Sequence, residues 1–291
     1  ASLRLVSRKT TGASSKETPN HADVADINIP TNNIVSWQDN RIVFVAPEGY
    51  GKSFGIVVTA GLQESNSDVI MGYHAPSISN ITLAGNRLAC SAMIRNDNCG
   101  APTLGGFLVE IIGKDFSSYS ELSKISKKLF EIDLGTPYSS EPITMGWCGG
   151  GQRTACVVPE QHKHESIVLY MPAGIGSLLP LRIRVANQLD QSAVGKNMFS
   201  YDPPWINAIT PREGNAGSIG TPNGNRIKIE GINFGEPDSV TVADASFSSL
   251  LQVFIGGKEC LNAAKVKESG QPTHIECSTQ RDRVGYKDIV L

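Results

Sequence analysis

The chain has 291 residues, which is enough for two or three ordinary domains with cores of their own. Its formal net charge of −2 leaves no overall field that would attract nucleic acid or an anionic membrane surface, so we expect neither partner. No apolar run approaches the roughly 18 residues of a membrane-spanning helix, so we expect no membrane span.

The N-terminal segment, ASLRLVSRK, alternates as a β-strand does, with Leu3 and Leu5 on one face and polar residues between them. A polar stretch, residues 9–23, follows it. We therefore expect residues 1–23 to form a strand with a polar tether, and the first domain to begin at residue 24.

The loop VAPEGYGKSFG, residues 45–55, contains the end of the phosphate-binding motif G-x-x-x-x-G-K-[ST]. Ala46 occupies the position of the motif's first glycine, and Pro47 removes a backbone amide. Glycine and β-branched residues follow, which favour a strand where the motif requires a helix. We therefore expect no nucleotide at Lys52 and Ser53, and no other cofactor.

The same loop belongs to an internal repeat. Residues 44–63 parallel residues 169–188, and three turn positions recur: Pro47 and Pro172, Gly49 and Gly174, Gly51 and Gly176. Lys52 and Ser53 do not recur, because the second copy has two leucines near them. The repeat therefore indicates a turn between two strands.

A second repeated block predicts the sheets of the molecule. Residues 103–116 parallel residues 221–235, and each copy alternates, reaches a glycine and then places an aromatic residue against the core: Gly113 and Phe116, Gly231 and Phe234. Short strands are also expected at residues 253–260, 274–277 and 286–291. Short strands at even spacing are typical of an all-β sandwich.

One segment has the spacing of a helix instead. Residues 117–132 carry Leu122, Ile125 and Leu129 at helical intervals. We expect a helix that covers an edge of the middle domain or crosses between strands, and a partner-binding helix is the alternative.

The six cysteines fall along the chain as close pairs: Cys90 and Cys99, Cys148 and Cys156, Cys260 and Cys277. Neither a C-x-x-C knuckle nor a Cys/His cluster is present, so no metal site is expected. Local disulfides in an oxidising compartment are favoured over free buried thiols. Asn80 begins the only N-x-[ST] sequon and is the predicted site of a covalent N-glycan in a secretory pathway.

These motifs together resemble the IPT/TIG domain, an immunoglobulin-like sandwich. The resemblance is clearest after Pro204, in the order P-x-I-x-x-I-T-P, G-x-x-I-x-I-x-G-x-N-F-G, V-x-I-G-G-x-x-C and I-x-C. The middle copy departs from it, since Asp115 replaces the motif's Asn and Leu169 its closing cysteine. The resemblance covers most of residues 42–291 and implies tandem extracellular modules: a partial one at 24–75, a complete one at 76–203 and one at 204–291 that lacks its last strand.

The incomplete outer modules allow two interpretations. One is that the chain is the ordered part of a longer repeat protein. The sharper hypothesis is donor-strand completion, in which Leu3 and Leu5 of one copy enter the open last module of the next, beside Ile289 and Leu291. Such a head-to-tail contact between copies does not close on itself and builds a filament.

No arrangement of residues indicates catalysis, so we expect no enzyme. His162 and His164 stand two apart, which suits a metal site on a strand, but no third ligand is near them in the sequence. Glu236 and Asp238 fit an acidic turn better than a catalytic pair.

The favoured function is therefore a structural or adhesive subunit of an extracellular or cell-surface filament. The first alternative is the ectodomain of a receptor that binds another protein. The second is a carbohydrate-binding surface protein, for which Trp37 and Trp205 would offer stacking faces, although core or interdomain packing is the better interpretation of both. The fold alone does not separate the three.

Overall fold

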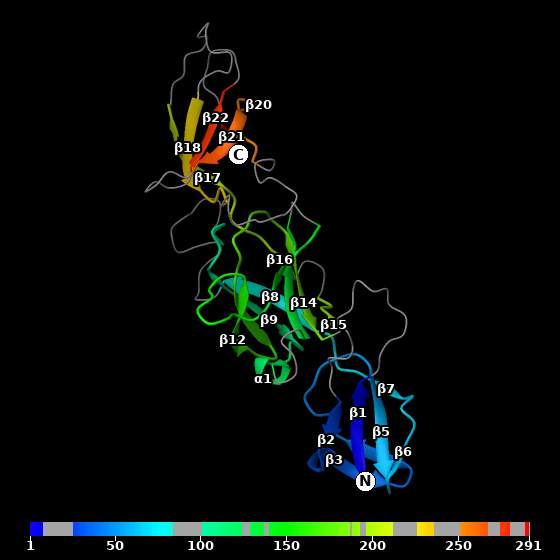
Figure 1. Ribbon diagram of the computed structural model, residues 1–291. Helices are drawn as coiled ribbons and strands as arrows, with labels where there is room; N and C mark the ends of the chain where they lie inside the picture. The colour runs from blue at the N-terminus through cyan, green and yellow to red at the C-terminus, as the bar shows by residue number, and fades with distance from the viewer. Residues whose placement is uncertain are drawn as a thin grey trace.

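The molecule is all-β, as the strand pattern predicts, and its antiparallel sheets form three units that follow one another in a row (Figure 1). The computed structural model describes residues 1–7, 26–83, 101–123, 129–136, 140–186, 188–192, 196–211, 226–235, 251–266, 274–279 and 289–290. No helix within these ranges is long and apolar enough to cross a membrane.

The middle unit contains two sheets and defines the full repeat. The first sheet has the order β12-β13-β9-β8, made of Cys156–His162, Ser166–Tyr170, Leu108–Lys114 and Ser77–Leu83. The second has the order β11-β10-β14-β15, made of Ile143–Met145, Phe130–Leu134, Leu179–Val185 and Gln188–Leu189, and β16 (Met198–Phe199) also pairs with β14.

Alternation along these strands builds the core of the middle unit. Phe130, Ile132 and Leu134 of β10 are buried, and the residues between them are half-buried. Val109 and Ile111 of β9 are completely buried. Each such side chain contributes roughly 1.5–3 kcal/mol by leaving water, so the apolar faces of the strands hold the unit together.

The third unit repeats the order of the middle one. Its first sheet is β17-β18-β22-β21, made of Trp205–Thr210, Arg226–Ile232, His274–Ser278 and Leu261–Val266. Its second sheet is β20-β19-β23, made of Lys258–Glu259, Phe254–Ile255 and Ile289–Val290. By position, β17 and β18 therefore correspond to β8 and β9, and β22 corresponds to β13.

The first unit matches only the later strands of the repeat. Its larger sheet has the order β2-β1-β5-β6, made of Ile27–Ile29, Ser2–Ser7, Phe54–Ala60 and Gln63–Glu64, and β7 (Ile70–Met71) also pairs with β5. A separate hairpin consists of β3 (Ile34–Gln38) and β4 (Arg41–Phe44), preceded by a 3₁₀ turn, Thr31–Asn33. Within the described residues, no strands of this unit correspond to β8 and β9.

Strand β1 corrects the predicted role of the N-terminus. It pairs along its whole length with β5 of the same chain, and Leu3 and Leu5 lie opposite Val58 and Ile56. Both leucines are buried in the core of the first unit, because the apolar face of β5 needs cover. The segment is thus part of the first unit instead of a separate tethered strand, and it could serve as a donor only by leaving this core.

The predicted helix is also mostly wrong. Among the described residues of this segment only Tyr119–Leu122, α1, is α-helical, and β10 begins at Phe130. Leu122 and Leu129 are buried as their apolar character requires. The residues from Phe130 onward alternate with period two, and pairing with β14 on one side and β11 on the other favours the strand.

A turn with the same geometry follows β9 and β18. After Gly113 the chain passes through Asp115 with φ of 61°, and after Gly231 through Asn233 with φ of 60°. In each copy an aromatic ring folds back onto the glycine: a Cβ at Gly113 would lie 2.2 Å from Cζ of Phe116, and one at Gly231 would lie 2.5 Å from Cζ of Phe234.

This contact predicts a cost for Gly113→Ala. The new Cβ would also meet the Ser77 carbonyl oxygen at 2.1 Å, so neither the ring nor the paired strand has room for it. We expect a loss of about 1–3 kcal/mol in the stability of the middle unit, measured by calorimetry. Gly146→Ala is the control, since a Cβ there has no neighbour within 4 Å; equal melting of the two variants would contradict the packing argument.

Candidate functional site

His162 is a structural histidine instead of a metal ligand. It is buried at the end of β12, where its Nδ1 accepts a hydrogen bond from Trp147 Nε1 at 3.0 Å. Since Nδ1 is an acceptor, Nε2 carries the proton and donates to the Phe116 carbonyl oxygen at 3.1 Å. The Phe130 ring packs on it with centroids 4.3 Å apart. Both ring nitrogens are therefore used within the protein.

The second histidine of the predicted pair points elsewhere. His164 is largely exposed, and its Nε2 lies 3.4 Å from Asp115 Oδ1. No group of three His, Cys, Asp or Glu side chains in the described part of the chain is arranged to hold a metal ion. Glu236 and Asp238 lie outside the described residues.

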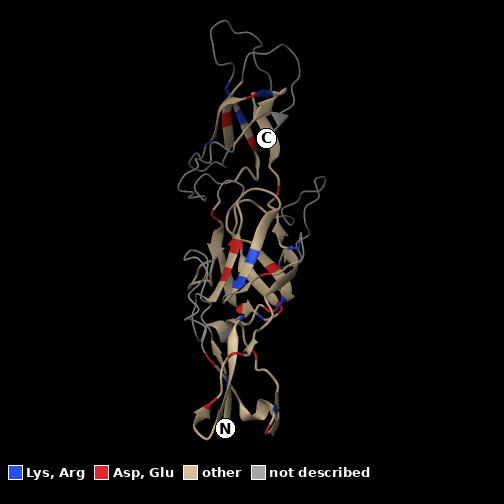
Figure 2. Ribbon diagram, turned by 90° about the vertical axis from the view of Figure 1, so that its right-hand side faces the viewer, with Lys and Arg blue, Asp and Glu red and all other residues tan. Residues whose placement is uncertain are grey.

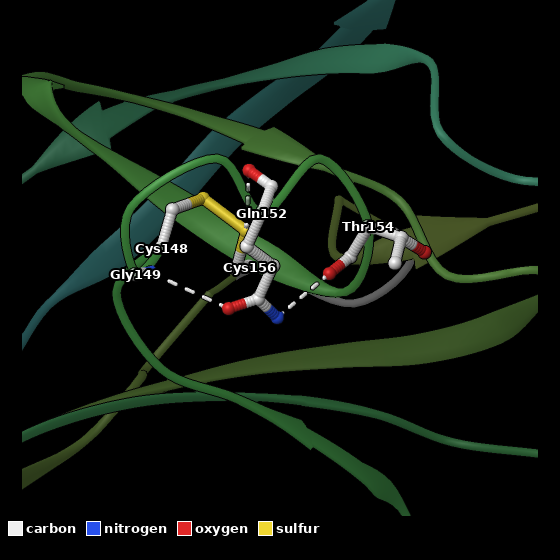
Figure 3. The surroundings of a disulfide bond; sticks show 5 residues. All are labelled: Cys148, Gly149, Gln152, Thr154 and Cys156. Atoms are coloured by element: carbon white, nitrogen blue, oxygen red, sulfur yellow. Dashed lines mark hydrogen bonds between the residues drawn. A yellow bond between two sulfur atoms is a disulfide. The ribbon is translucent and has the colours of Figure 1, made fainter.

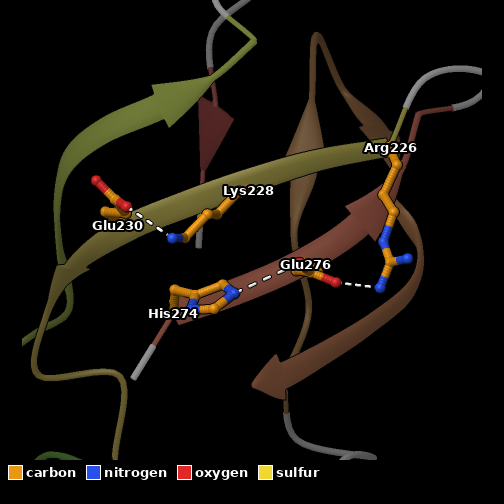
Figure 4. Close-up of polar contacts among 5 residues, drawn as sticks. All are labelled: Arg226, Lys228, Glu230, His274 and Glu276. Atoms are coloured by element: carbon orange, nitrogen blue, oxygen red, sulfur yellow. Dashed lines mark hydrogen bonds and ion pairs between the residues drawn. The ribbon is translucent and has the colours of Figure 1, made fainter. Parts of the chain in front are cut away.

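A polar cluster on the third unit belongs to its sheet surface (Figure 4). Glu276 of β22 accepts from Arg226 and lies 3.4 Å from His274 Nε2, and Lys228 pairs with Glu230 at 3.0 Å. Desolvation raises the pKa of the Glu276 carboxyl, but hydrogen bonds from His274 and Arg226, together with their charges, outweigh it and lower the pKa. The cluster thus holds two neighbouring strands together.

Two of the predicted disulfides are present. Cys148–Cys156 closes the glycine-rich loop between β11 and β12, and Gln152 braces that loop by accepting from the Gly149 amide and donating to the Thr154 carbonyl (Figure 3). Cys260–Cys277 links the start of β21 to β22 within the core of the third unit. The predicted pair Cys90 and Cys99 lies outside the described residues.

The glycine-rich loop that resembles a phosphate site is a contact between the first two units. The Gly51 amide donates to Gln188 Oε1 at 2.9 Å, and the Gly51 carbonyl accepts from the Tyr73 amide at 2.9 Å. Gln188 Nε2 in turn donates to the Tyr73 carbonyl at 2.7 Å. The amide of the motif's second glycine is therefore already bound, and Gln188, from β15 of the middle unit, is buried.

The recurring proline and glycines of this loop each have a structural role. Tyr73 donates its hydroxyl to the Pro47 carbonyl at 3.0 Å, and a Cβ on Gly49 would lie 2.5 Å from the Tyr73 ring. The middle unit repeats the arrangement: Tyr201 donates to the Pro172 carbonyl at 2.8 Å, and a Cβ on Gly174 would lie 2.7 Å from the Tyr201 ring. Gly51 and Gly176 have φ of 109° and 110°, which favours glycine at both positions.

Further hydrogen bonds brace the start of the middle unit and fasten that unit to the third. Near the first unit, the Gln191 amide donates to the Pro76 carbonyl at 2.8 Å, and the Ser192 hydroxyl accepts from the Ile78 amide at 2.7 Å. Near the third, buried Thr103 accepts from the Gly235 amide through its hydroxyl at 3.2 Å and from the Gly174 amide through its carbonyl at 2.9 Å. Two of the buried polar residues in the described chain, Gln188 and Thr103, thus lie at junctions between units.

The remaining residues singled out from the sequence are exposed, lie in a short strand, or fall outside the described residues. Asn80 is exposed on β8, as a glycan would require, and the glycan itself stays a prediction. Trp37 and Trp205 are 38% and 46% exposed, so neither is a core residue, and interdomain packing, the other placement favoured from the sequence, stays a prediction. Ile289 lies in β23, and Leu291 lies outside the described residues.

Comparisons with known proteins do not assign a family. No protein-family model matches the chain, and no curated protein matches it. A crystal structure with xylogluco-oligosaccharide aligns with 73% of this chain and 37% of its own, at 12% identity and a TM-score of 0.29. That score is too low to indicate a shared fold, so the oligosaccharide tells nothing about this chain.

The junction geometry predicts the effect of Gln188→Ala. The substitution leaves the Gly51 amide without its acceptor, and a buried unpaired amide costs about 1–3 kcal/mol. We expect faster hydrogen exchange at the amide of Gly51, measured by mass spectrometry. Gln152→Ala, in the disulfide loop, is the matched control and leaves the junction unchanged; the same exchange pattern in both variants would contradict the role of Gln188.

Burial of His162 predicts a loss of stability in acid. Desolvation lowers its pKa from 6.5 to about 4, and the hydrogen bond with Phe116 only partly offsets this. Between pH 6.5 and about 4 the unfolded state takes up a proton that the folded state refuses, so stability falls by about 3 kcal/mol as the pH decreases through that range. Urea unfolding of the wild type and of His162→Gln at several pH values measures this change in stability. The variant should lack this component of the pH dependence, and parallel pH curves would refute the assignment.

Proposed function

We propose that this protein is a non-enzymatic structural or adhesive component of an extracellular or cell-surface assembly. Its units are IPT/TIG-like sandwiches, and its work is to hold binding surfaces at fixed spacing along an extended array. The observation that carries the proposal is a pair of polar junctions: buried Gln188 is hydrogen-bonded to Gly51 and Tyr73 of the first unit, and buried Thr103 to Gly235 of the third.

The placement of the titratable and charged side chains supports a structural role. Buried His162 is satisfied within the fold, and Figure 2 shows both signs of charge in all three units. Fixed hydrogen bonds between consecutive sandwiches limit the bending that a flexible linker would allow. The two disulfides fit an oxidising compartment, which supports the extracellular placement.

We further propose assembly in a line through the ends of the array. Within the described residues the first unit has fewer strands than the middle one, and an unpaired strand edge leaves backbone groups that another strand can pair with. Because such a contact joins one end to a different surface, it extends without closing. The N-terminal strand is not the donor in this arrangement, since Leu3 and Leu5 are buried in their own unit.

Assembly of the full chain tests this function. We expect sedimentation to show species whose mass grows with protein concentration, and negative-stain microscopy to show them as threads one array wide. Lateral clumps would argue against end-to-end growth. A monomer at every concentration would overturn the assembly role and favour a receptor ectodomain.

A further inference from the structure

Two histidines that are far apart in the sequence approach the same carboxylate. His74 belongs to the segment between β7 and β8, which leads from the first unit into the middle one, and His164 belongs to the turn between β12 and β13. Asp115 directly follows β9, and its Oδ1 lies 3.4 Å from His164 Nε2 while its Oδ2 lies 4.0 Å from His74 Nδ1. In place of the sequence neighbours His162 and His164, three separate segments thus bring together two imidazoles and one carboxylate.

The backbone holds the turns of Asp115 and His164 against each other. The Gly113 amide donates to the Glu165 carbonyl at 2.9 Å, and the Phe116 amide donates to the His164 carbonyl at 3.1 Å. These two hydrogen bonds lie on either side of Asp115 along the chain. The carboxylate and the imidazole of His164 are therefore presented to each other by a fixed scaffold within the middle unit.

The segment that carries His74 is held at the junction of the first two units. His74 directly follows Tyr73, whose amide donates to the Gly51 carbonyl at 2.9 Å and whose carbonyl accepts from Gln188 at 2.7 Å. The side chain of His74 itself is 91% exposed. Its ring can therefore turn toward Asp115 without disturbing a core.

Asp115 has a charge that its turn does not require. Asn233 occupies the same position in the third unit, with φ of 60° against 61° for Asp115. Asn and Asp both tolerate this left-handed conformation, so either residue could shape the turn. Asn233 donates its amide to the Pro203 carbonyl at 3.4 Å, whereas the carboxylate of Asp115 faces imidazoles. The charge at position 115 thus has a role other than forming the turn.

The three side chains offer the ligand atoms that zinc prefers. Imidazole nitrogen together with carboxylate oxygen suits Zn²⁺, whereas Ca²⁺ and Mg²⁺ prefer oxygen ligands alone. Two ligand atoms of one tetrahedral zinc ion lie about 3.3–3.5 Å apart, which is the separation of His164 Nε2 and Asp115 Oδ1. As the side chains stand, no three donors in the described part of the chain surround one point, so His74 has to turn inward when the ion binds.

We propose that His74, Asp115 and His164 bind a zinc ion, with water in the fourth position, and that this ion ties the first unit to the middle one. Two of the ligands are fixed on the middle unit, and the third continues directly from the junction at Tyr73. The bound ion therefore limits rotation between the two units. This inference goes beyond the proposed function, since a chain that stays monomeric can carry the site equally well.

Titration of the full chain with ZnCl₂ in an isothermal calorimeter tests the site. We expect one saturable zinc site that an excess of CaCl₂ does not displace, because two of its ligands are nitrogen atoms. His74→Ala, Asp115→Asn and His164→Ala should each weaken zinc binding at least about tenfold, since even the loss of a residue that only supports a ligand costs about 10–100-fold.

The choice of variants keeps the fold intact. Asp115→Asn gives the middle unit the residue that the third unit has at this position, and both histidine side chains are largely exposed. Asp202→Asn is the matched control: Asp202 occupies the place of His74 in the repeat, at the junction of the middle and third units, and its substitution should leave zinc binding unchanged.

Hydrogen exchange measures whether the ion ties the units together. Zinc should slow exchange of the Tyr73 amide in the wild type, because that amide donates to Gly51 across the loop at the junction. It should have no such effect in His74→Ala. The Gly235 amide, at the other junction, should exchange at the same rate with and without zinc.

The outcomes decide between this site and its alternatives. Absence of zinc binding, or binding that survives all three substitutions, would overturn the site. Binding that needs Asp115 and His164 but not His74, or that leaves exchange at Tyr73 unchanged, would refute the tie between units. Zinc binding by a chain that never assembles would keep the site and refute assembly, whereas assembly without zinc binding would do the reverse.

Discussion

An aromatic ring that lies where a side chain would otherwise stand is the constraint on which the repeat depends. It occurs at the turn after the second strand of a unit and again where a unit meets the next: Gly113 with Phe116, Gly231 with Phe234, Gly49 with Tyr73, and Gly174 with Tyr201. Each ring closes one end of a core, and each tyrosine also hydrogen-bonds a proline carbonyl of the loop it covers. The same glycines therefore allow both the packing of these rings at the ends of the cores and the geometry of the junctions between units.

Such local features are predicted well from the sequence, because each depends on residues within a short stretch of chain. Glycines at turns, alternating strands and cysteines close in sequence led to the all-β fold and to the two disulfides that are present. The pairing of strands that are far apart along the chain could not be predicted from the sequence. The N-terminal strand finds β5 about fifty residues away, and Phe130 begins a strand because β11 and β14 flank it. The only sequence signal for Gln188 was that it matches Gln63 in the internal repeat. Hydrophobic periodicity does not predict which polar side chain will be buried.

The two junctions between units are built in a similar way. The middle unit supplies both side chains: Gln188 accepts from the Gly51 amide of the first unit, and Thr103 accepts from the Gly235 amide of the third.

Under tension along the array, the disulfides would limit how far the units can lengthen. Cys260 and Cys277 are 17 residues apart in sequence, and each residue of a stretched chain spans at most about 3.3–3.6 Å. The bridge thus withholds roughly 55–60 Å from a third unit that has been pulled open. The loop closed by Cys148–Cys156 withholds about half as much. An array built this way yields in short, bounded steps instead of running out to the contour length of its chain.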